Sequence, residues 1–248
     1  MDNYLYKLNI LDENKKIKIT DGTKRVKLDI GLSYSAPHSQ SWLLENENDL
    51  MVFGFEPHPV NINSIKNGSI KREASHGEPL DVKFINEDKF KLIPCALGIE
   101  NKDTILYMTK EDSGCSSIHE PLYFELEDKI NVKMFTLKSF FDLFPWETIP
   151  FIDHIKIDAQ GNDLDIIKGA GNYLSEKVVF ITAEPEASHY KNVTNSESEM
   201  DEYMKSIGFA KIINKNVFPN CHSVDPTYIN INFVQYPFIY NINYFQMG

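Results

Sequence analysis

The sequence has few cysteines and a deficit of basic residues. Its 3 cysteines, Cys95, Cys115 and Cys221, are far apart and odd in number, so they indicate neither a disulfide framework nor a zinc knuckle. The chain has 25 lysine and arginine residues against 36 aspartate and glutamate residues, which gives a net charge of −11. This balance argues against nucleic acid and against an anionic membrane surface as partners.

Long apolar stretches are also missing. No run approaches the roughly 18–20 apolar residues that cross a bilayer, and the start of the chain, Met1 to Tyr4, lacks the basic and apolar regions of a signal peptide. We therefore expect no membrane association and a cytoplasmic location. The 248 residues, 42% of them hydrophobic and 25% charged, suit one globular α/β domain. We expect residues 1–248 to form it, with residues 1–24 as a cap containing a short strand near 15–20.

Apolar runs alternate with segments of helical pattern along the chain. The expected core strands are 26–30, 51–55, 90–97, 152–157 and 177–183, and the expected helices are 39–47, 61–67, 163–174 and 197–206. Two extra strands, 104–108 and 132–137, surround a serine-rich loop. The last two strands, 209–213 and 228–234, have no helical pattern between them, which indicates an antiparallel pair at one edge.

Strands that alternate with helices predict a parallel sheet covered on both faces. With a reversed last strand, the layout resembles the fold of class I methyltransferases more than that of dinucleotide dehydrogenases. The predicted fold class is therefore α/β, a Rossmann-like three-layer α/β/α arrangement. Its sheet has seven mostly parallel strands and an antiparallel last strand.

The first strand ends in a sequence that suits a ligand site. Asp29 is expected at the carboxyl end of the strand, where open α/β sheets bind ligands, and Gly31 allows a tight turn. Ser33 and Ser35 stand where dinucleotide sites have glycine, which weakens a phosphate-binding interpretation. A carboxylate here favours a cationic or hydroxyl-bearing ligand, although a simple strand-to-turn junction remains an alternative.

An acid also ends the second strand. Glu56 is placed to accept hydrogen bonds from two ribose hydroxyls, and Pro57 fixes the turn that follows. The alternative is an exposed loop carboxylate, as most glutamates are. Asp29 and Glu56 on adjacent strands together favour a nucleoside ligand.

A third acid, Asp158, ends the strand 152–157. Gly161 turns the chain, and Asn162 or Asp163 is expected to cap the next helix. Three strand-end acids in one crevice would raise the pKa of at least one of them, as a general base requires. Alternatively, Asp158 only receives backbone donors.

These motifs, in this order, resemble the FkbM family of S-adenosylmethionine-dependent methyltransferases over roughly residues 25–233. The most specific piece is the family pattern Lys-Ile-Asp-Val-Glu-Gly-x-Glu. Residues 156–163 read Lys-Ile-Asp-Ala-Gln-Gly-Asn-Asp, so Gln160 and Asp163 replace the two glutamates.

The resemblance implies S-adenosylmethionine as cofactor and a role for each matching residue. The amino-acid end of the cofactor would contact Asp29, Gly31 and Ser33, and its ribose would contact Glu56 and Pro57. Its adenine would lie beside Cys95, Ala96 and Leu97, and Ser117 would line the pocket. Asp158 would flank the methyl group and the acceptor, Gln160 would orient an acceptor hydroxyl, and Glu184, after strand 177–183, would face the acceptor.

The acceptor implied by the resemblance is a hydroxyl of a sugar, a glycan or a small metabolite. Asp158, Glu184 or His189 are the expected catalytic bases, and no close ligand spacing predicts a metal. A cofactor-binding module without transfer and a nucleotide-dependent oxidoreductase remain alternatives. Asp225 to Tyr228 is interpreted as a proline turn, and the aromatic tail from Tyr236 to Phe245 as packing or a surface for homo-oligomers.

Overall fold

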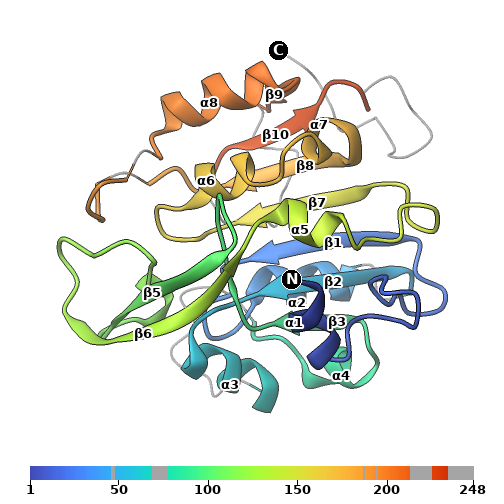
Figure 1. Ribbon diagram of the computed structural model, residues 1–248, viewed down its shortest axis with the longest axis horizontal. Helices are drawn as coiled ribbons and strands as arrows, with labels where there is room; N and C mark the ends of the chain where they lie inside the picture. The colour runs from blue at the N-terminus through green and yellow to red at the C-terminus, as the bar shows by residue number, and fades with distance from the viewer. Residues whose placement is uncertain (46–47, 69–77, 187, 194, 213–224, 234–248) are drawn as a thin grey trace.

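Two β-sheets organise the protein. The structure is a computed structural model and describes residues 1–45, 48–68, 78–186, 188–193, 195–212 and 225–233 (Figure 1). The main sheet has seven strands in the order β3-β2-β1-β7-β8-β10-β9, and a smaller sheet has three in the order β4-β6-β5. The aromatic tail from Tyr236 to Phe245 lies outside the described residues.

The main sheet has the predicted topology. Its strands are β1 (Arg25–Ile30), β2 (Leu50–Phe55), β3 (Phe90–Ile93), β7 (Ile152–Ile157), β8 (Val178–Ala183), β9 (Phe209–Lys211) and β10 (Thr227–Asn230). All neighbours pair in parallel except β10, which is antiparallel to both β8 and β9. The predicted fold class, with its reversed last strand, is confirmed.

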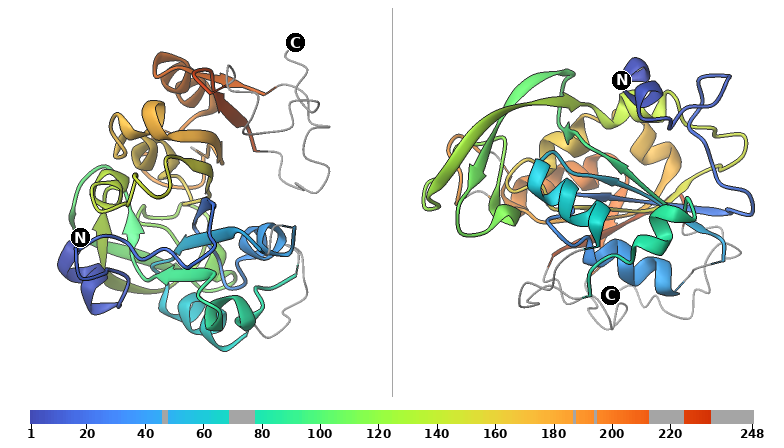
Figure 2. Two further views of the ribbon diagram at one scale, coloured as in Figure 1. Left: turned by 90° about the vertical axis from the view of Figure 1, so that its right-hand side faces the viewer. Right: turned by 90° about the horizontal axis from the view of Figure 1, so that it is seen from below.

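Helices cover both faces of the main sheet (Figures 1 and 2). They are α1 (Asp2–Lys7), α2 (Pro37–Glu45), α3 (Pro59–Asn67), α4 (Val82–Asn86), α5 (Leu137–Phe141), α6 (Asp163–Lys168), α7 (Tyr173–Lys177) and α8 (Glu197–Ser206). Side chains alternate along β2, so Val52 packs in the cluster that holds Leu43 of α2, whereas Phe53 packs edge-on against Phe140 of α5. Burial on both faces explains why β2 is a continuous apolar run.

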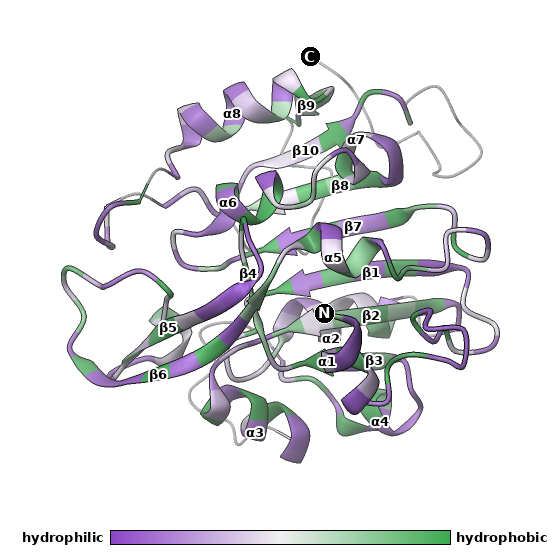
Figure 3. Cartoon of the chain, viewed as in Figure 1, coloured by the Kyte–Doolittle hydropathy of each residue, from purple (hydrophilic) through white to green (hydrophobic). Residues whose placement is uncertain are grey.

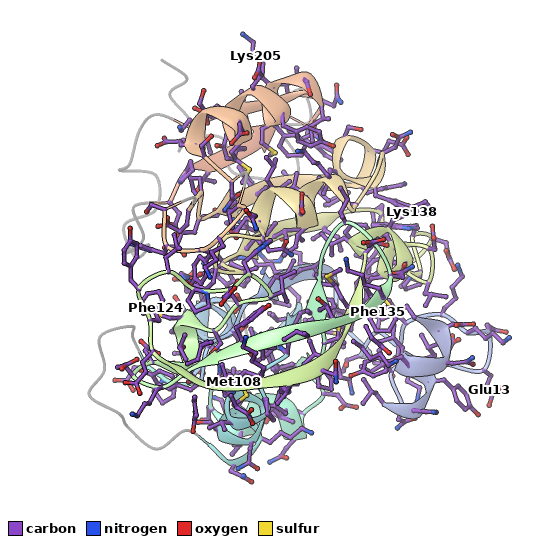
Figure 4. All side chains as sticks on the ribbon, turned by 60° about the vertical axis from the view of Figure 1, so that its left-hand side comes forward. Glu13, Met108, Phe124, Phe135, Lys138 and Lys205 are labelled. Atoms are coloured by element: carbon purple, nitrogen blue, oxygen red, sulfur yellow. The ribbon has the colours of Figure 1, made fainter. Side chains whose placement is uncertain are left out.

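The smaller sheet projects beside the carboxyl ends of the main strands (Figure 1). It contains β4 (Ala96–Leu97), β5 (Lys102–Thr109) and β6 (Leu126–Phe135), with a 3-10 turn, η1 (Ser113–Cys115), after β5. Figure 4 shows the β5–β6 pair crossing the front of the molecule, with Met108 near one end and Phe135 near the other. In the main sheet β2 and β8 are largely hydrophobic, whereas β5 and β6 are mixed (Figure 3), as expected for a ribbon with one solvated face.

Several predicted elements have other ends in the structure; the strand 132–137, for example, is β6, which begins at Leu126 and ends at Phe135, and α5 follows from Leu137. Three predicted elements differ in kind. The strand 90–97 is interrupted at Pro94, which has no N–H for the ladder, so β3 stays in the main sheet and β4 joins the smaller one. The helix 163–174 is two helices, because Gly171 between them has a left-handed φ of +60°. Within the described residues 1–45, the expected strand near 15–20 is only a bridge between Leu11 and Ile17, and α1 precedes it.

The helix 197–206 is confirmed at both ends. Ser196 and Glu199 form a reciprocal capping box at its start, in which each side chain accepts a hydrogen bond from the other residue's backbone.

In the part of the chain that the structure describes, no helix combines the length and apolar character needed to cross a membrane.

Candidate active site

A pocket lies where β1, β2 and β7 end, opposite the loop that follows β5. Its apolar wall includes Ile30, Phe55, Cys95, Ala96, Leu97, Leu106 and Ile118. Its polar lining includes Ser33, Glu56, Asn61, Ser117, Asp158, Gln160 and Asn162. Gly31 and Pro57 also line it, so every predicted cofactor-binding residue except Asp29 contributes to this one pocket.

The turns after β1 and β7 meet through backbone atoms. Gly31 has a left-handed φ of +79°, and a Cβ atom built on it would lie 1.8 Å from the backbone oxygen of Asp158. The Asp158 N–H donates to the Ile30 carbonyl at 2.9 Å, and the Gly31 N–H donates to the Phe55 carbonyl at 3.0 Å. Only glycine fits at this position, and these contacts hold the ends of β1, β2 and β7 together.

Glu56 is buried at the end of β2 and faces the pocket. One carboxylate oxygen accepts from the Leu32 N–H at 3.1 Å and the other from the His58 N–H at 2.8 Å. Burial raises its pKa to about 8, although these hydrogen bonds act in the opposite direction. The Asn61 side chain and the Ser33 backbone also form hydrogen bonds with it, so a ligand's hydroxyl groups would share these carboxylate oxygens with protein donors.

The loop after β5 closes the pocket on its other side. The Ser113 hydroxyl donates to the Asn61 side-chain oxygen at 2.7 Å, which ties η1 to α3. The Ser117 hydroxyl donates to the Gln160 carbonyl at 2.7 Å, which ties the same loop to the turn after β7. The pocket is therefore enclosed by segments that are far apart in the sequence.

A buried lysine lies beside Asp158. The Nζ atom of Lys156 is 3.0 Å from one Asp158 carboxylate oxygen and 3.9 Å from an oxygen of Asp225. Burial of Asp158 favours its neutral form, but Lys156 and hydrogen bonds from neighbouring side chains outweigh it and hold the Asp158 pKa well below its usual range. Asp158 is therefore ionised at neutral pH.

The sequence interpretation gave no role in the site to Lys156 or to Asp225, the second acid beside that lysine. The position of Lys156 within a buried strand could have predicted an acidic partner, because a buried ammonium requires a counter-charge. Asp225 was assigned to a turn alone, and the structure places it next to this lysine.

Glu184 lies beyond Asp158, after β8, and does not line the pocket itself. Burial and the neighbouring Asp158, which shares a hydrogen bond with it, raise the Glu184 pKa to about 9. The Gln160 side-chain nitrogen is 2.7 Å from an Asp158 oxygen and 3.3 Å from a Glu184 oxygen. Asp158, Gln160 and Glu184 thus form one hydrogen-bonded group.

Asp29 has a different position from the other strand-end acids. One of its carboxylate oxygens accepts from the Ser39 N–H at 3.1 Å and from the Ser39 hydroxyl at 2.5 Å, so it binds the first turn of α2. Burial raises its pKa, whereas His38 and Ser39 lower it. Glu56 and Asp158 line the pocket, and Asp29 holds the helix beside it.

The two residues expected to cap α6 act differently. Asn162 makes no capping hydrogen bond; its amide donates to the Leu97 carbonyl at 2.8 Å. Asp163 accepts from the Ala159 N–H at 3.2 Å and the Glu184 N–H at 3.0 Å, which joins the turns after β7 and β8. Burial raises its pKa to about 7. The capping prediction was wrong because these side chains have closer tertiary partners.

His189 is outside the pocket lining. Its Nδ1 atom lies 3.1 Å from a Glu186 oxygen, its side chain is 47% exposed, and its ring packs edge-on against Tyr123 and Phe124. Figure 4 labels Phe124 at the edge of the molecule. Direct proton transfer by His189 therefore requires an acceptor that extends out to this edge.

Nothing in the described residues gathers three side chains able to hold a metal ion. The groups of the site are carboxylates, amides and hydroxyls held by backbone contacts. They are suited to bind hydroxyl-bearing ligands and to move a proton.

Comparisons with known proteins give the family of the chain. No curated protein matches the sequence. A solved structure, the methyltransferase FkbM from Methylobacillus flagellatus KT, is 13% identical with a TM-score of 0.47, and the match covers 92% of this chain and 50% of that one. The chain thus spans about half the length of that protein. Residues 29–210, more than half of the chain, match the family described as Methyltransferase FkbM domain. The chain therefore belongs to the FkbM methyltransferase family.

Proposed function

We propose that this protein is an S-adenosylmethionine-dependent methyltransferase that methylates a hydroxyl group of a sugar, a glycan or a small metabolite. The observation that carries the proposal is Glu56, a buried carboxylate that faces the pocket at the end of β2. The Leu32 and His58 N–H groups already donate to this carboxylate, and the two hydroxyls of a ribose would add further donors from the pocket side.

The residues of the pocket fit an adenosyl group. Ala96, Leu97 and Ile118 offer an apolar surface for a flat aromatic base, and Glu56 lies at the same pocket for the ribose. The absence of a Cβ on Gly31 lets the turn after β1 contact the turn after β7, and both turns line the pocket. When bound, S-adenosylmethionine would supply an electrophilic methyl group.

The chain's own residues would align the acceptor and handle its proton. Asp158 lines the pocket in its ionised form and can accept a hydrogen bond from the acceptor hydroxyl. Glu184 forms a hydrogen bond with it, which holds the Asp158 carboxylate in place as the acceptor of that hydrogen bond. His189 stays a further prediction for a base.

The charge of the lining supports an uncharged acceptor. Among the described residues that line the pocket there is no lysine or arginine, whereas Glu56 and Asp158 are both acidic. A phosphorylated acceptor would meet like charge here, and a polyhydroxyl compound would find carboxylate and amide partners.

Calorimetry and a transfer assay test the proposal. We expect S-adenosylmethionine and S-adenosylhomocysteine to bind and NAD not to bind, and we expect labelled methyl to reach hydroxylated acceptors from a panel of sugars and glycans. Tight cofactor binding without transfer to any acceptor would support a binding module instead. Preferential binding of NAD would support the oxidoreductase and contradict the proposal.

A further inference from the structure

The Gln160 side chain is held in one orientation. The backbone of Gln160 has a left-handed φ of +50°, uncommon for a residue with a Cβ, and its carbonyl accepts from the Ser117 hydroxyl at 2.7 Å. Its side-chain oxygen lies 2.7 Å from the hydroxyl of buried Tyr190. That hydroxyl is also 2.8 Å from the Cys115 carbonyl, so its single proton is shared by two acceptors.

The other end of the same amide contacts two carboxyl groups. Its nitrogen lies 2.7 Å from an oxygen of Asp158 and 3.3 Å from an oxygen of Glu184. Rotating the amide by half a turn would place its oxygen against the ionised carboxylate, where neither atom could donate. The amide N–H groups are therefore committed to the two acids.

We propose that Gln160 is a positioning residue: its fixed amide clamps Asp158 and Glu184 together as a pair that shares one proton and carries one negative charge. In the family pattern that this segment resembles, a glutamate stands at this place. A glutamate here would put three carboxyl groups in contact, whereas the amide adds two donors and no charge. The inference rests on the proposed function only for its use, which is to hold one ionised carboxylate in place to accept a hydrogen bond from the acceptor hydroxyl.

The surroundings of the pair support a single charge. The groups that interact electrostatically with it come from several elements: Lys156 from β7, Asp225 from before β10, His38 from α2, Cys115 from η1 and Tyr190 from after β8. Asp163 of α6 is also acidic and feels the charge of Asp158. Lys156 is the one cation whose contact with Asp158 is direct, at 3.0 Å, so a second full negative charge would lack an equivalent partner among the described residues.

Carbon-13 NMR of the side-chain carboxyls tests the clamp without any acceptor. In the wild-type protein, one carboxyl assigned to Asp158 should titrate below pH 4 and one assigned to Glu184 above pH 7. Gln160→Ala removes a donor to both groups, so both midpoints should rise by about one pH unit. Tyr190→Phe frees the amide oxygen and should produce a smaller rise.

Gln160→Glu provides the complementary test. It should add a third titrating carboxyl to the cluster and raise the Glu184 midpoint further, because like charges disfavour ionisation. Gln40→Ala is the matched control: the Gln40 oxygen also accepts a fixed hydrogen bond, from the Asp81 N–H at 2.9 Å, but it is not part of this cluster. It should leave both midpoints in place.

The inference is overturned if Gln160→Ala and Gln160→Glu, both with native amide NMR spectra, leave the Asp158 and Glu184 midpoints unchanged. A parallel titration with S-adenosylhomocysteine keeps the two proposals apart. Failure to bind this compound, with the midpoints shifting as expected, would reject the proposed function and retain the clamp. Normal binding of this compound together with unchanged titration midpoints would reject the clamp alone.

Discussion

Gly31 and Asp158 are in contact through their backbones, since a Cβ atom on Gly31 would lie 1.8 Å from the Asp158 carbonyl oxygen. The turn after β1 therefore presses directly against the turn after β7. The two segments are 127 positions apart (158 − 31) in the sequence, and this contact joins the proposed cofactor and acceptor parts of the pocket.

Gly31→Ala should destabilise the protein more than an ordinary glycine substitution at positive φ. Gly22 is the matched control, because its φ is +84° but a Cβ there meets nothing within 4 Å. We expect Gly22→Ala to lower the free energy of unfolding by about 1–2 kcal/mol, the cost of the left-handed backbone. Gly31→Ala should cost about 2 kcal/mol more, because backbone must also move. Urea unfolding of both variants measures the difference, and equal losses would mean that the two turns separate easily.

Cofactor binding should depend on the ionisation of Glu56. Its pKa is raised to about 8 by burial, and the ionised form accepts hydrogen bonds from hydroxyls best. Affinity for S-adenosylhomocysteine should therefore rise with pH, by up to about tenfold per unit below pH 8, and level off above it. Calorimetry in buffers from pH 6 to pH 9 measures this dependence, because that range lies on both sides of the raised pKa.

Glu56→Gln is the corresponding variant. It should bind about 1–3 kcal/mol more weakly at pH 9 and lose the pH dependence. Unchanged affinity in Glu56→Gln and Glu56→Ala would remove this residue from the ligand site.

Lys156→Met should destabilise the protein at neutral pH. The substitution leaves Asp158 and Asp225 without their shared cation and should lower the free energy of unfolding by about 2 kcal/mol. This is less than for fully buried pairs, because a third of the Asp158 side chain is exposed. Lys133→Met, which breaks an exposed ion pair with Asp103, should cost less than about 1 kcal/mol.

The effect of Lys156→Met should fade in acid. The folded-state pKa of Asp158 is depressed below its ordinary value of 3.8, so the stability it contributes is present above that pH and is lost as pH falls through the folded pKa. Unfolding measured at pH 7 and again below pH 4 should show the gap between variant and wild type narrowing. A gap that stays constant would mean that Lys156 stabilises the fold through packing alone.

Asp158→Asn should reduce turnover more than it reduces cofactor affinity. The amide keeps the shape of the side chain but removes the negative charge that faces the acceptor. Single-turnover methyl transfer and calorimetry on the same preparation separate the two effects. An equal loss in both would make Asp158 a binding residue only.

Much of the fold follows from local patterns. The strand 152–157 and the helix 197–206 have the predicted bounds, because a fully buried strand is a continuous apolar run and a capping box marks a helix start. The division of 90–97 could have been predicted from Pro94, which cannot donate to a ladder. The small sheet that receives residues 96–97 could not, since that pairing depends on β6 far along the chain.

The site was only partly predictable for a similar reason. Strand ends identify Glu56 and Asp158, but alternation alone does not say that Asp29 meets the first turn of α2. The approach of Asp225 to Lys156 depends on how β10 inserts between β8 and β9, and no local pattern encodes that position.

A crystal structure with bound S-adenosylhomocysteine tests the central claim most directly. We predict the ribose hydroxyls within hydrogen-bond distance of the Glu56 carboxylate, the adenine against Ala96 and Leu97, and the sulfur on the side of Asp158 and Gln160. An adenosyl group bound at another place, or in this pocket with its ribose away from Glu56, would contradict the claim.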